Sequence, residues 1–390
     1  MKGTIKSKNW VLLFFLVSAI GIGCFMALNY HANPLGYFTN EKGLQYSYTD
    51  DYGRSIKAKY ILDHKDDIEA VVMGGSKAGA LNTELLTKYT GLKYYNLYYN
   101  MGNFADYLRY TKFLIDNTDI QEITIHLSSY EVLSYDRTYR GNAYKVPATL
   151  SGNLWAEAKE FLSYLMTDIK TTKNALTKRA KKNPMYADDL TNGMKNRVAD
   201  TNSAKKDHDT FVRKSVTNTM AKHLKTLFLE NTNNEDELDA RVKSVEALRE
   251  IRKLCDDNGI TLKVMIGASF LAERYTYECD EYYDYLRQIV EVAGEVWDFS
   301  SFCDVNLNPY NFANEKHFNR AVADCMVNIM YGAETREDFG IVLTPENILP
   351  YLLQRRADFK KLRAEYLMNG YVQLKGMDDP SYIPLEDYGY

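Results

Sequence analysis

The stretch at residues 68–86, IEAVVMGGSKAGALNTELL, decides how the chain begins to fold. Its residues 70–73 are apolar and uninterrupted, which is typical of a short buried strand, and the leucines near its end recur at helical spacing. Between them, Gly74 and Gly75 allow the backbone to turn tightly. The stretch therefore predicts a strand, a sharp turn and a helix, with Ser76 in the turn.

Ser76 has two interpretations. A hydroxyl at a helix start lies beside unpaired N–H groups, so a nucleophile and an anion-binding pocket would share one corner. Alternatively, Ser76 only caps the helix, because serine is a favoured N-cap residue. Nucleotide binding is disfavoured, since the glycines form neither G-x-G-x-x-G nor a P-loop. Lys77 directly follows Ser76, which excludes the S-x-x-K arrangement.

Strand-like and helix-like segments alternate along much of the chain. The expected strands are residues 70–73, 94–99, 122–127, 260–266 and 296–299. The expected helices between them are residues 104–117, 235–258 and 275–293. This alternation predicts an α/β fold, a parallel sheet with helices on both faces.

Two other parts of the chain depart from the alternation. Residues 141–234 read as a helical insertion, with helical stretches at 154–180 and 211–230 around a basic, polar section. Residues 336–390 read as a C-terminal helical extension with a helix near 346–368. The body of the fold is therefore expected at residues 66–335.

The N-terminus predicts a membrane anchor. Residues 10–28 carry no charge and are long enough to span a hydrocarbon core as a helix. Lys2, Lys6 and Lys8 precede them, and positive charge before a first span keeps that end cytoplasmic. We therefore expect residues 1–9 to be a cytoplasmic tail. Residues 29–65 should form a stalk, and both this stalk and the rest of the chain should lie outside the membrane. A cleaved signal peptide is the alternative.

Charge and cysteine content narrow the possible partners. A net charge of -4 and a pI of about 6.0 give no electrostatic footprint for nucleic acid. Four cysteines follow the apolar segment, at positions 255, 279, 303 and 325. They permit two disulfides outside the cell but match no zinc pattern, and buried thiols are the alternative.

Ser76 early in the chain and His317 late, opening the last helix of the α/β unit, resemble the SGNH (GDSL-like) hydrolases. The resemblance is closer to the membrane-anchored SGNH-like proteins of bacterial cell-surface acylation. It covers residues 68–331 without the insertion, together with the N-terminal anchor. It implies a flavodoxin-like parallel sheet.

The motifs match in part. The first block, Gly-Asp-Ser, reads Gly74, Gly75, Ser76, and the glycine of the second block corresponds to Gly102, after Asn96. The third block, Gly-x-Asn-Asp, reads SSYE at residues 128–131, without the usual asparagine. The fifth block, Asp-x-x-His, reads NEKH, so its acid is replaced by Asn314.

The resemblance implies acyl transfer or ester hydrolysis on a cell-surface polysaccharide or teichoic-acid-type polymer. Ser76 would be the nucleophile, His317 the base and Asn314 the group that orients the imidazole. The backbone N–H groups of Ser76 and Gly102 would form the oxyanion hole. No metal or diffusible cofactor is implied, and a multi-span membrane-bound O-acyltransferase is an implied partner. The alternatives are a catalytically inactive module that binds or scaffolds at the cell envelope, and a purely structural envelope protein.

Overall fold

Six strands form one sheet in the order β2-β1-β3-β4-β5-β6. The strands are β1 (Ala70–Gly74), β2 (Tyr94–Tyr98), β3 (Glu122–Leu127), β4 (Thr261–Ile266), β5 (Val296–Asp298) and β6 (Ile341–Leu343). The first five run parallel, and β6 is antiparallel to β5. Every residue of β1, β2 and β3 is buried, as expected for strands covered on both faces. The predicted α/β fold with a mostly parallel sheet is confirmed.

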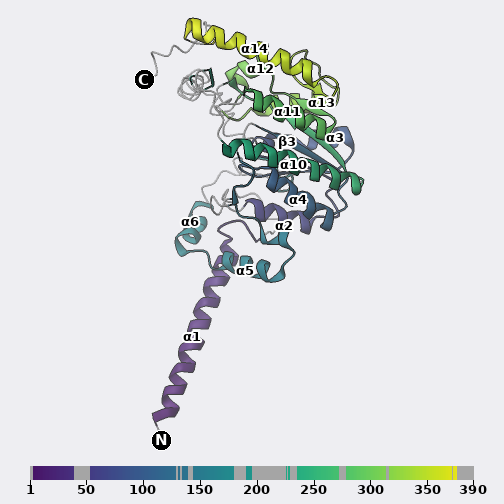
Figure 1. Ribbon diagram of the computed structural model, residues 1–390. Coiled ribbons are helices and arrows are strands. Elements are labelled where there is room, and N and C mark those ends of the chain that lie inside the picture. The colour runs from purple at the N-terminus through teal and green to yellow at the C-terminus, as the bar shows by residue number, and fades with distance from the viewer. Residues whose placement is uncertain are drawn as a thin grey trace.

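These elements come from a computed structural model (Figure 1). It describes residues 3–38, 53–128, 131, 134–138, 144–179, 190–195, 225, 227–228, 235–271, 278–312, 316–370 and 372–375.

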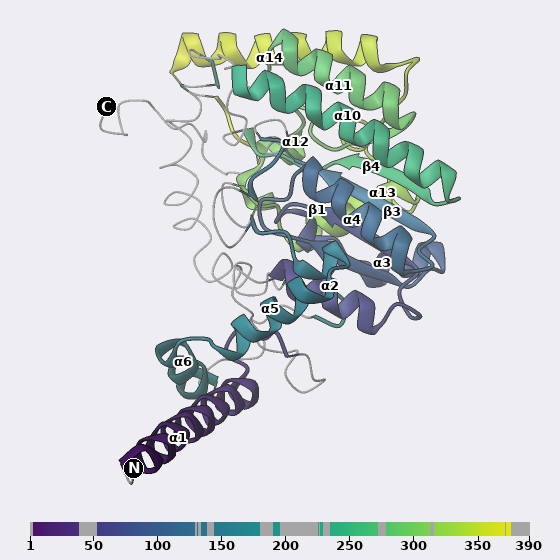
Figure 2. The same ribbon diagram turned by 60° about the horizontal axis from the view of Figure 1, so that its bottom comes forward.

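Helices cover both faces of the sheet. On one face α4 (Phe104–Asn117), α10 (Glu235–Asp257) and α11 (Asp280–Ala293) lie side by side (Figure 2). On the other face α3 (Thr83–Thr90) and α13 (Arg320–Met330) pack together. Side chains alternate along β1, so Val71 and Met73 join the core under the first layer. Ala70 and Val72 join the core under the second.

The strand order determines where a site can form. The order 2-1-3-4-5 is that of flavodoxin-like doubly wound sheets, which bind ligands at the carboxyl ends of the strands where the order reverses. Here the order reverses between β1 and β3. Ser76 follows β1 and Ser128 follows β3, so both residues lie at this edge.

One long helix extends from the body. Helix α1 (Gly3–Ala32) protrudes on its own (Figure 1), and its segment Lys8–Ala32 is long and apolar enough to cross a membrane. None of its most apolar window is buried in the body. Its upper end is attached to the body through the buried Asn29. The amide of Asn29 donates to the carbonyls of Leu165 and Thr167, each at 2.8 Å.

The predicted stalk is wrong where the structure describes it. Helix α2 (Gly53–Asp63) lies within residues 29–65, and its Ile56 and Ile61 are fully buried in the core. Leu35 and Phe38 are also buried. These parts belong to the body, because they supply apolar side chains that the core needs.

The predicted insertion contains helices α5 (Leu154–Leu165) and α6 (Ile169–Arg179), separated by a break where one continuous helix was expected. Of the predicted helix at 211–230, only residues 225, 227 and 228 are described.

The C-terminal extension contains a strand as well as a helix, because β6 joins the sheet before α14 (Ile348–Asn369) begins. None of the five cysteines, all of which lie in the described residues, forms a disulfide, and Cys255 and Cys303 are buried, so the buried-thiol alternative fits better.

Candidate functional site

The structure brings Ser76 and His317 together. The Oγ of Ser76 lies 2.8 Å from the Nε2 of His317, although 241 residues separate them in the chain. His317 lies in the loop before α13, and contacts of residues on both sides of His317 in the chain hold this loop in place. A β-bridge joins Phe312 to the buried Phe318, and Asn319 accepts a hydrogen bond from the N–H of Val322 as the N-cap of α13. The histidine is therefore held by its neighbours' packing.

The turn that carries Ser76 differs from the prediction. Ser76 neither opens nor caps an α-helix, because a short 3-10 helix η1 (Ala78–Ala80) follows it and Asn82 caps α3. The buried amide of Asn96 explains the difference. It donates to the carbonyls of Ala78 and Leu81, at 2.8 and 3.0 Å, and so occupies acceptors that a continuing α-helix would use.

Two glycine-containing segments, the turn at Gly74 and Gly75 and the loop at Gly102, meet beside Ser76. A Cβ on Gly102 would lie 3.0 Å from the carbonyl oxygen of Gly74, and one on Gly74 would lie 2.5 Å from the Cβ of Ala78. The loop before Gly102 includes Met101 at φ 55, a backbone conformation that is uncommon for residues other than glycine. Such conformations cluster at active sites and ligand clamps.

The proposed oxyanion donor Gly102 lies close to Ser76 but is not free. Its N is 3.7 Å from the position that a Cβ of Gly75 would take. The same N–H donates to the carbonyl of Tyr99 at 3.2 Å, near the long limit of a hydrogen bond. This N–H would have to turn from Tyr99 toward an oxyanion during a reaction.

A buried ion pair fixes the loop that holds Gly102. The guanidinium of Arg54 on α2 pairs with the carboxylate of Asp106 on α4, and both side chains are buried. Arg54 also donates to the carbonyl of Asn100 at 3.3 Å. Arg54 was missed from the sequence because it lies in the predicted stalk. The sequence around a single arginine in an irregular segment does not indicate which distant residue it pairs with.

Glu131 is a second group that the sequence did not single out for a role. Its buried carboxylate accepts two hydrogen bonds from Ser128, from the N–H and the hydroxyl, both at 2.8 Å. The hydroxyl of Tyr107 donates to it at 2.7 Å. Burial raises the pKa of Glu131, and the hydrogen bonds from Tyr107 and Ser128 oppose that rise. Glu131 therefore fixes the end of β3 next to Ser76, in the segment aligned with the third block.

A second histidine lies beneath the site. His126 is fully buried on β3 and pairs in register with Gly74, and neither of its ring nitrogens has a hydrogen-bond partner among the described residues. Burial and the nearby cation of Lys77 lower the pKa of His126 to about 3, so the ring is neutral. Its ring leaves no room for a side chain at Gly267, whose Cβ would lie 1.9 Å from Nε2.

The third member of the proposed constellation, Asn314, lies outside the described residues, as does Glu315. Asp304, the nearest acidic residue before Asn314 in the sequence, is exposed on helix α12 (Asp304–Leu307). Its carboxylate lies 3.3 Å from the Nζ of Lys375. An exposed carboxylate paired with a lysine is weakly suited to orienting an imidazole.

Comparison of the chain with protein-family models and with curated proteins found no match.

Proposed function

We propose that the chain is a membrane-anchored, extracytoplasmic serine acyltransferase or esterase of the SGNH-like type. Its substrates would be O-acyl groups of a cell-surface glycan or teichoic-acid-type polymer. The observation that carries the proposal is the 2.8 Å contact between the Ser76 hydroxyl and the His317 ring at the reversal point of the strand order. Geometry of this kind is what general-base activation of a serine requires.

In the proposed reaction, the Nε2 of His317 takes the hydroxyl proton as Ser76 Oγ bonds to the ester carbonyl carbon. The N–H groups of Ser76 and Gly102 stabilise the resulting oxyanion. Collapse of this intermediate breaks the bond to the leaving alcohol, which receives the proton from His317. An acyl-serine remains. Water or a glycan hydroxyl then attacks the acyl carbonyl carbon as His317 takes its proton. The bond from that carbon to Ser76 Oγ breaks, Oγ receives the proton back from His317, and the free acid or the acylated glycan leaves.

The rest of the chain agrees with this assignment. The strand order is the flavodoxin-like one expected of an SGNH-like domain. The apolar helix α1 supports anchoring in a membrane, and the lysines before it favour a body outside the cytoplasm. The acyl group would come from a membrane-held donor, with a multi-span O-acyltransferase as the proposed partner.

Labelling with a fluorophosphonate tests the proposal, because this reagent phosphonylates activated serines. The full-length chain in detergent should be labelled, and the Ser76→Ala variant should not. His317→Ala should reduce the labelling rate by about 10³-fold or more, since serine is a weak nucleophile without its base. Ser301→Ala is the matched control, because Ser301 is a partly exposed serine outside the proposed site, and its hydroxyl donates to the backbone carbonyl of Asp338 at 2.6 Å. It should label like the wild type.

A catalytically inactive envelope-binding module is the second candidate. Two observations favour it: the N–H of Gly102 is already engaged with Tyr99, and the aligned orienting residue Asn314 carries no charge. Absence of labelling in a chain that melts cooperatively would contradict the enzyme and support this module. Labelling that persists in Ser76→Ala would contradict the proposed nucleophile.

A further inference from the structure

Helix α5 turns an apolar stripe toward solvent. Leu154 and Trp155 are 81% and 85% exposed, and Leu162, Met166 and Ile169 further along are at least half exposed. Leu154, Trp155, Leu162 and Met166 fall on one side of α5 at helical spacing, and Ile169 extends this apolar surface at the start of α6. An amphipathic helix of a water-soluble body normally buries this face, so the arrangement here is inverted.

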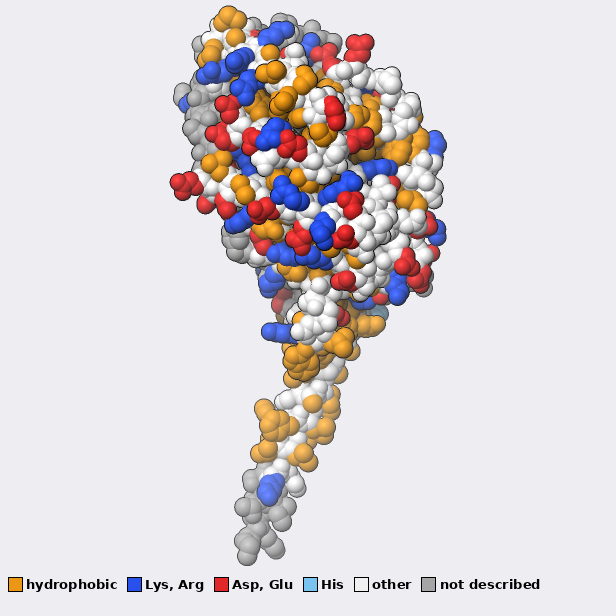
Figure 3. Space-filling model, turned by 45° about the vertical axis from the view of Figure 1, so that its right-hand side comes forward, with side chains coloured by type: hydrophobic (Ala, Val, Ile, Leu, Met, Phe, Trp, Pro, Cys, Tyr) orange, Lys and Arg blue, Asp and Glu red, His pale blue; other side chains and the backbone are white. Residues whose placement is uncertain are grey.

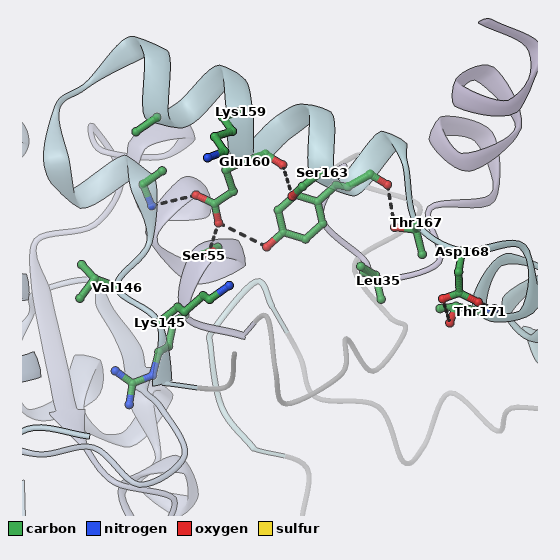
Figure 4. A pocket seen from close by; sticks show the side chains of 14 residues that line it. Leu35, Ser55, Lys145, Val146, Lys159, Glu160, Ser163, Thr167, Asp168 and Thr171 are labelled. Carbon is green, nitrogen blue, oxygen red and sulfur yellow. Dashed lines mark hydrogen bonds between the residues drawn. The ribbon is translucent and has the colours of Figure 1, made fainter. Parts of the chain in front are cut away.

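The opposite face of α5 is fixed against the body. It lines a cavity of about 700 Å³ between α5 and α2, into which Glu160 points (Figure 4). Glu160 accepts hydrogen bonds from the hydroxyl of Ser55 at 2.5 Å and from the N–H of Ala148 at 2.8 Å. These bonds set the rotation of α5 about its axis. The apolar stripe therefore cannot turn inward without breaking them.

The stripe lies at the end of the body from which α1 leaves. Helices α5 and α6 both contact α1 (Figure 1). Asn29 of α1 bonds to the carbonyls that end α5, and its Oδ1 accepts from the hydroxyl of Thr172 on α6 at 2.5 Å. Figure 3 shows hydrophobic side chains gathered where α1 joins the body. A bilayer crossed by α1 would therefore meet α5 directly, with no spacer between them.

We propose that α5 is an interfacial membrane helix. Its Leu154, Trp155, Leu162 and Met166, together with Ile169 at the start of α6, insert into the headgroup and upper acyl region of the bilayer that α1 spans. The inference rests on the proposed anchoring by α1 and not on the chemistry of Ser76. Tryptophan and aliphatic side chains on one face are typical of such helices. This second contact holds the body in one orientation on the membrane surface.

Quenching of tryptophan by brominated lipids tests the proposal in the full-length chain. The chain has three tryptophans, Trp10, Trp155 and Trp297. A Trp10→Phe chain, reconstituted in phosphatidylcholine and phosphatidylglycerol vesicles brominated near the carbonyl end of the acyl chains, reports on Trp155 and Trp297. Subtracting the signal of Trp10→Phe/Trp155→Phe isolates Trp155. We expect short-wavelength emission from Trp155 that bromine quenches and aqueous iodide does not.

Leu162→Glu in the Trp10→Phe chain should decrease the bromine quenching of Trp155, because a carboxylate opposes insertion of the stripe. The matched control is Leu353→Glu, since Leu353 is 70% exposed on α14 at the far end of the body (Figure 1). It should leave the quenching unchanged.

Emission of Trp155 that iodide quenches and bromine does not would overturn the proposal and leave the stripe to a protein partner. An unchanged signal in Leu162→Glu would also overturn it. Trp10, measured in a Trp155→Phe chain, reports separately on α1. If bromine quenches Trp10 but not Trp155, only the proposal for α5 fails. If it quenches neither, anchoring by α1 fails too.

Discussion

His126 makes the stability of the body depend on pH. The unfolded imidazole takes a proton near pH 6.5, whereas burial and Lys77 lower the pKa of the folded ring to about 3. Between these values the unfolded chain binds more protons, so stability is complete above pH 6.5 and decreases as the pH falls toward 3. We expect His126 to account for a loss of about 1–2 kcal/mol between pH 6.5 and pH 5.

The measurement compares the unfolding free energy of the wild type and His126→Leu in detergent across this pH range. Leucine leaves a small cavity, which lowers stability by a similar amount at every pH, but it has no proton to bind. The pH dependence of the variant should therefore be shallower. Equal slopes for the two chains would show that His126 is not held neutral.

At the same scale, the sequence predicted only part of the candidate site. Ser76 and His317 could be found because each occupies a recognisable local position, one after a strand and one before a helix. Arg54, Glu131 and His126 could not, because their roles depend on burial and on partners brought together by the fold. No local pattern distinguishes a buried charged residue from a solvated one.

At the scale of elements, the buried pair of Arg54 and Asp106 joins α2 to α4. Among the described residues, Arg54→Met would leave the buried carboxylate of Asp106 with Arg109 as its remaining cationic neighbour, whose Nη1 is 3.7 Å away. Removing one partner of a buried ion pair lowers the free energy of unfolding by about 3–5 kcal/mol. Because Arg109 stays near Asp106, we expect a loss near the lower end of this range. Arg54→Met/Asp106→Leu should recover much of this loss, because no unpaired charge remains.

Chemical denaturation monitored by circular dichroism measures both variants. Lys112→Met is the matched control, since the pair of Lys112 and Glu250 joins α4 to α10 with both side chains about half exposed. Its loss should cost less than about 1 kcal/mol. An equally small effect of Arg54→Met would mean that the buried pair does not stabilise the contact of α2 with α4.

The elements themselves were predictable to different degrees. Strands β1, β3 and β4 are rich in apolar and β-branched residues and β2 in tyrosine, and the long apolar stripe of α10 is followed by Gly259. By contrast, β6 has three residues, and its pairing with β5 depends on a contact far along the chain. The break between α5 and α6 also has a tertiary cause, because its carbonyls bond to Asn29 of α1.

At the scale of the whole molecule, the attachment of α1 limits what Ser76 can reach. The last turn of α1 is hydrogen-bonded to the α5–α6 corner, which holds this end of the body next to the apolar segment of α1. On the proposed function, the acyl donor must come to the membrane surface. This arrangement suits a donor delivered by a membrane-embedded partner better than one diffusing in solution.

The orientation of the molecule in the membrane provides the last prediction. Lys2, Lys6 and Lys8 should hold the N-terminus in the cytoplasm, because cationic flanks are retained on that side. Protease added to intact expressing cells should therefore digest the body of the wild type. In Lys2→Glu/Lys6→Glu/Lys8→Glu, a fraction of the chains should insert in the opposite direction, so that their bodies are protected from protease until the cells are lysed.

The matched control replaces Lys159, Lys170 and Lys173 with glutamate. These three lysines are exposed on the body, beyond the C-terminal end of α1. This change removes positive charge from the translocated side, so the body should stay sensitive. A wild-type body protected in intact cells would place Ser76 in the cytoplasm, where no cell-surface polymer could reach it.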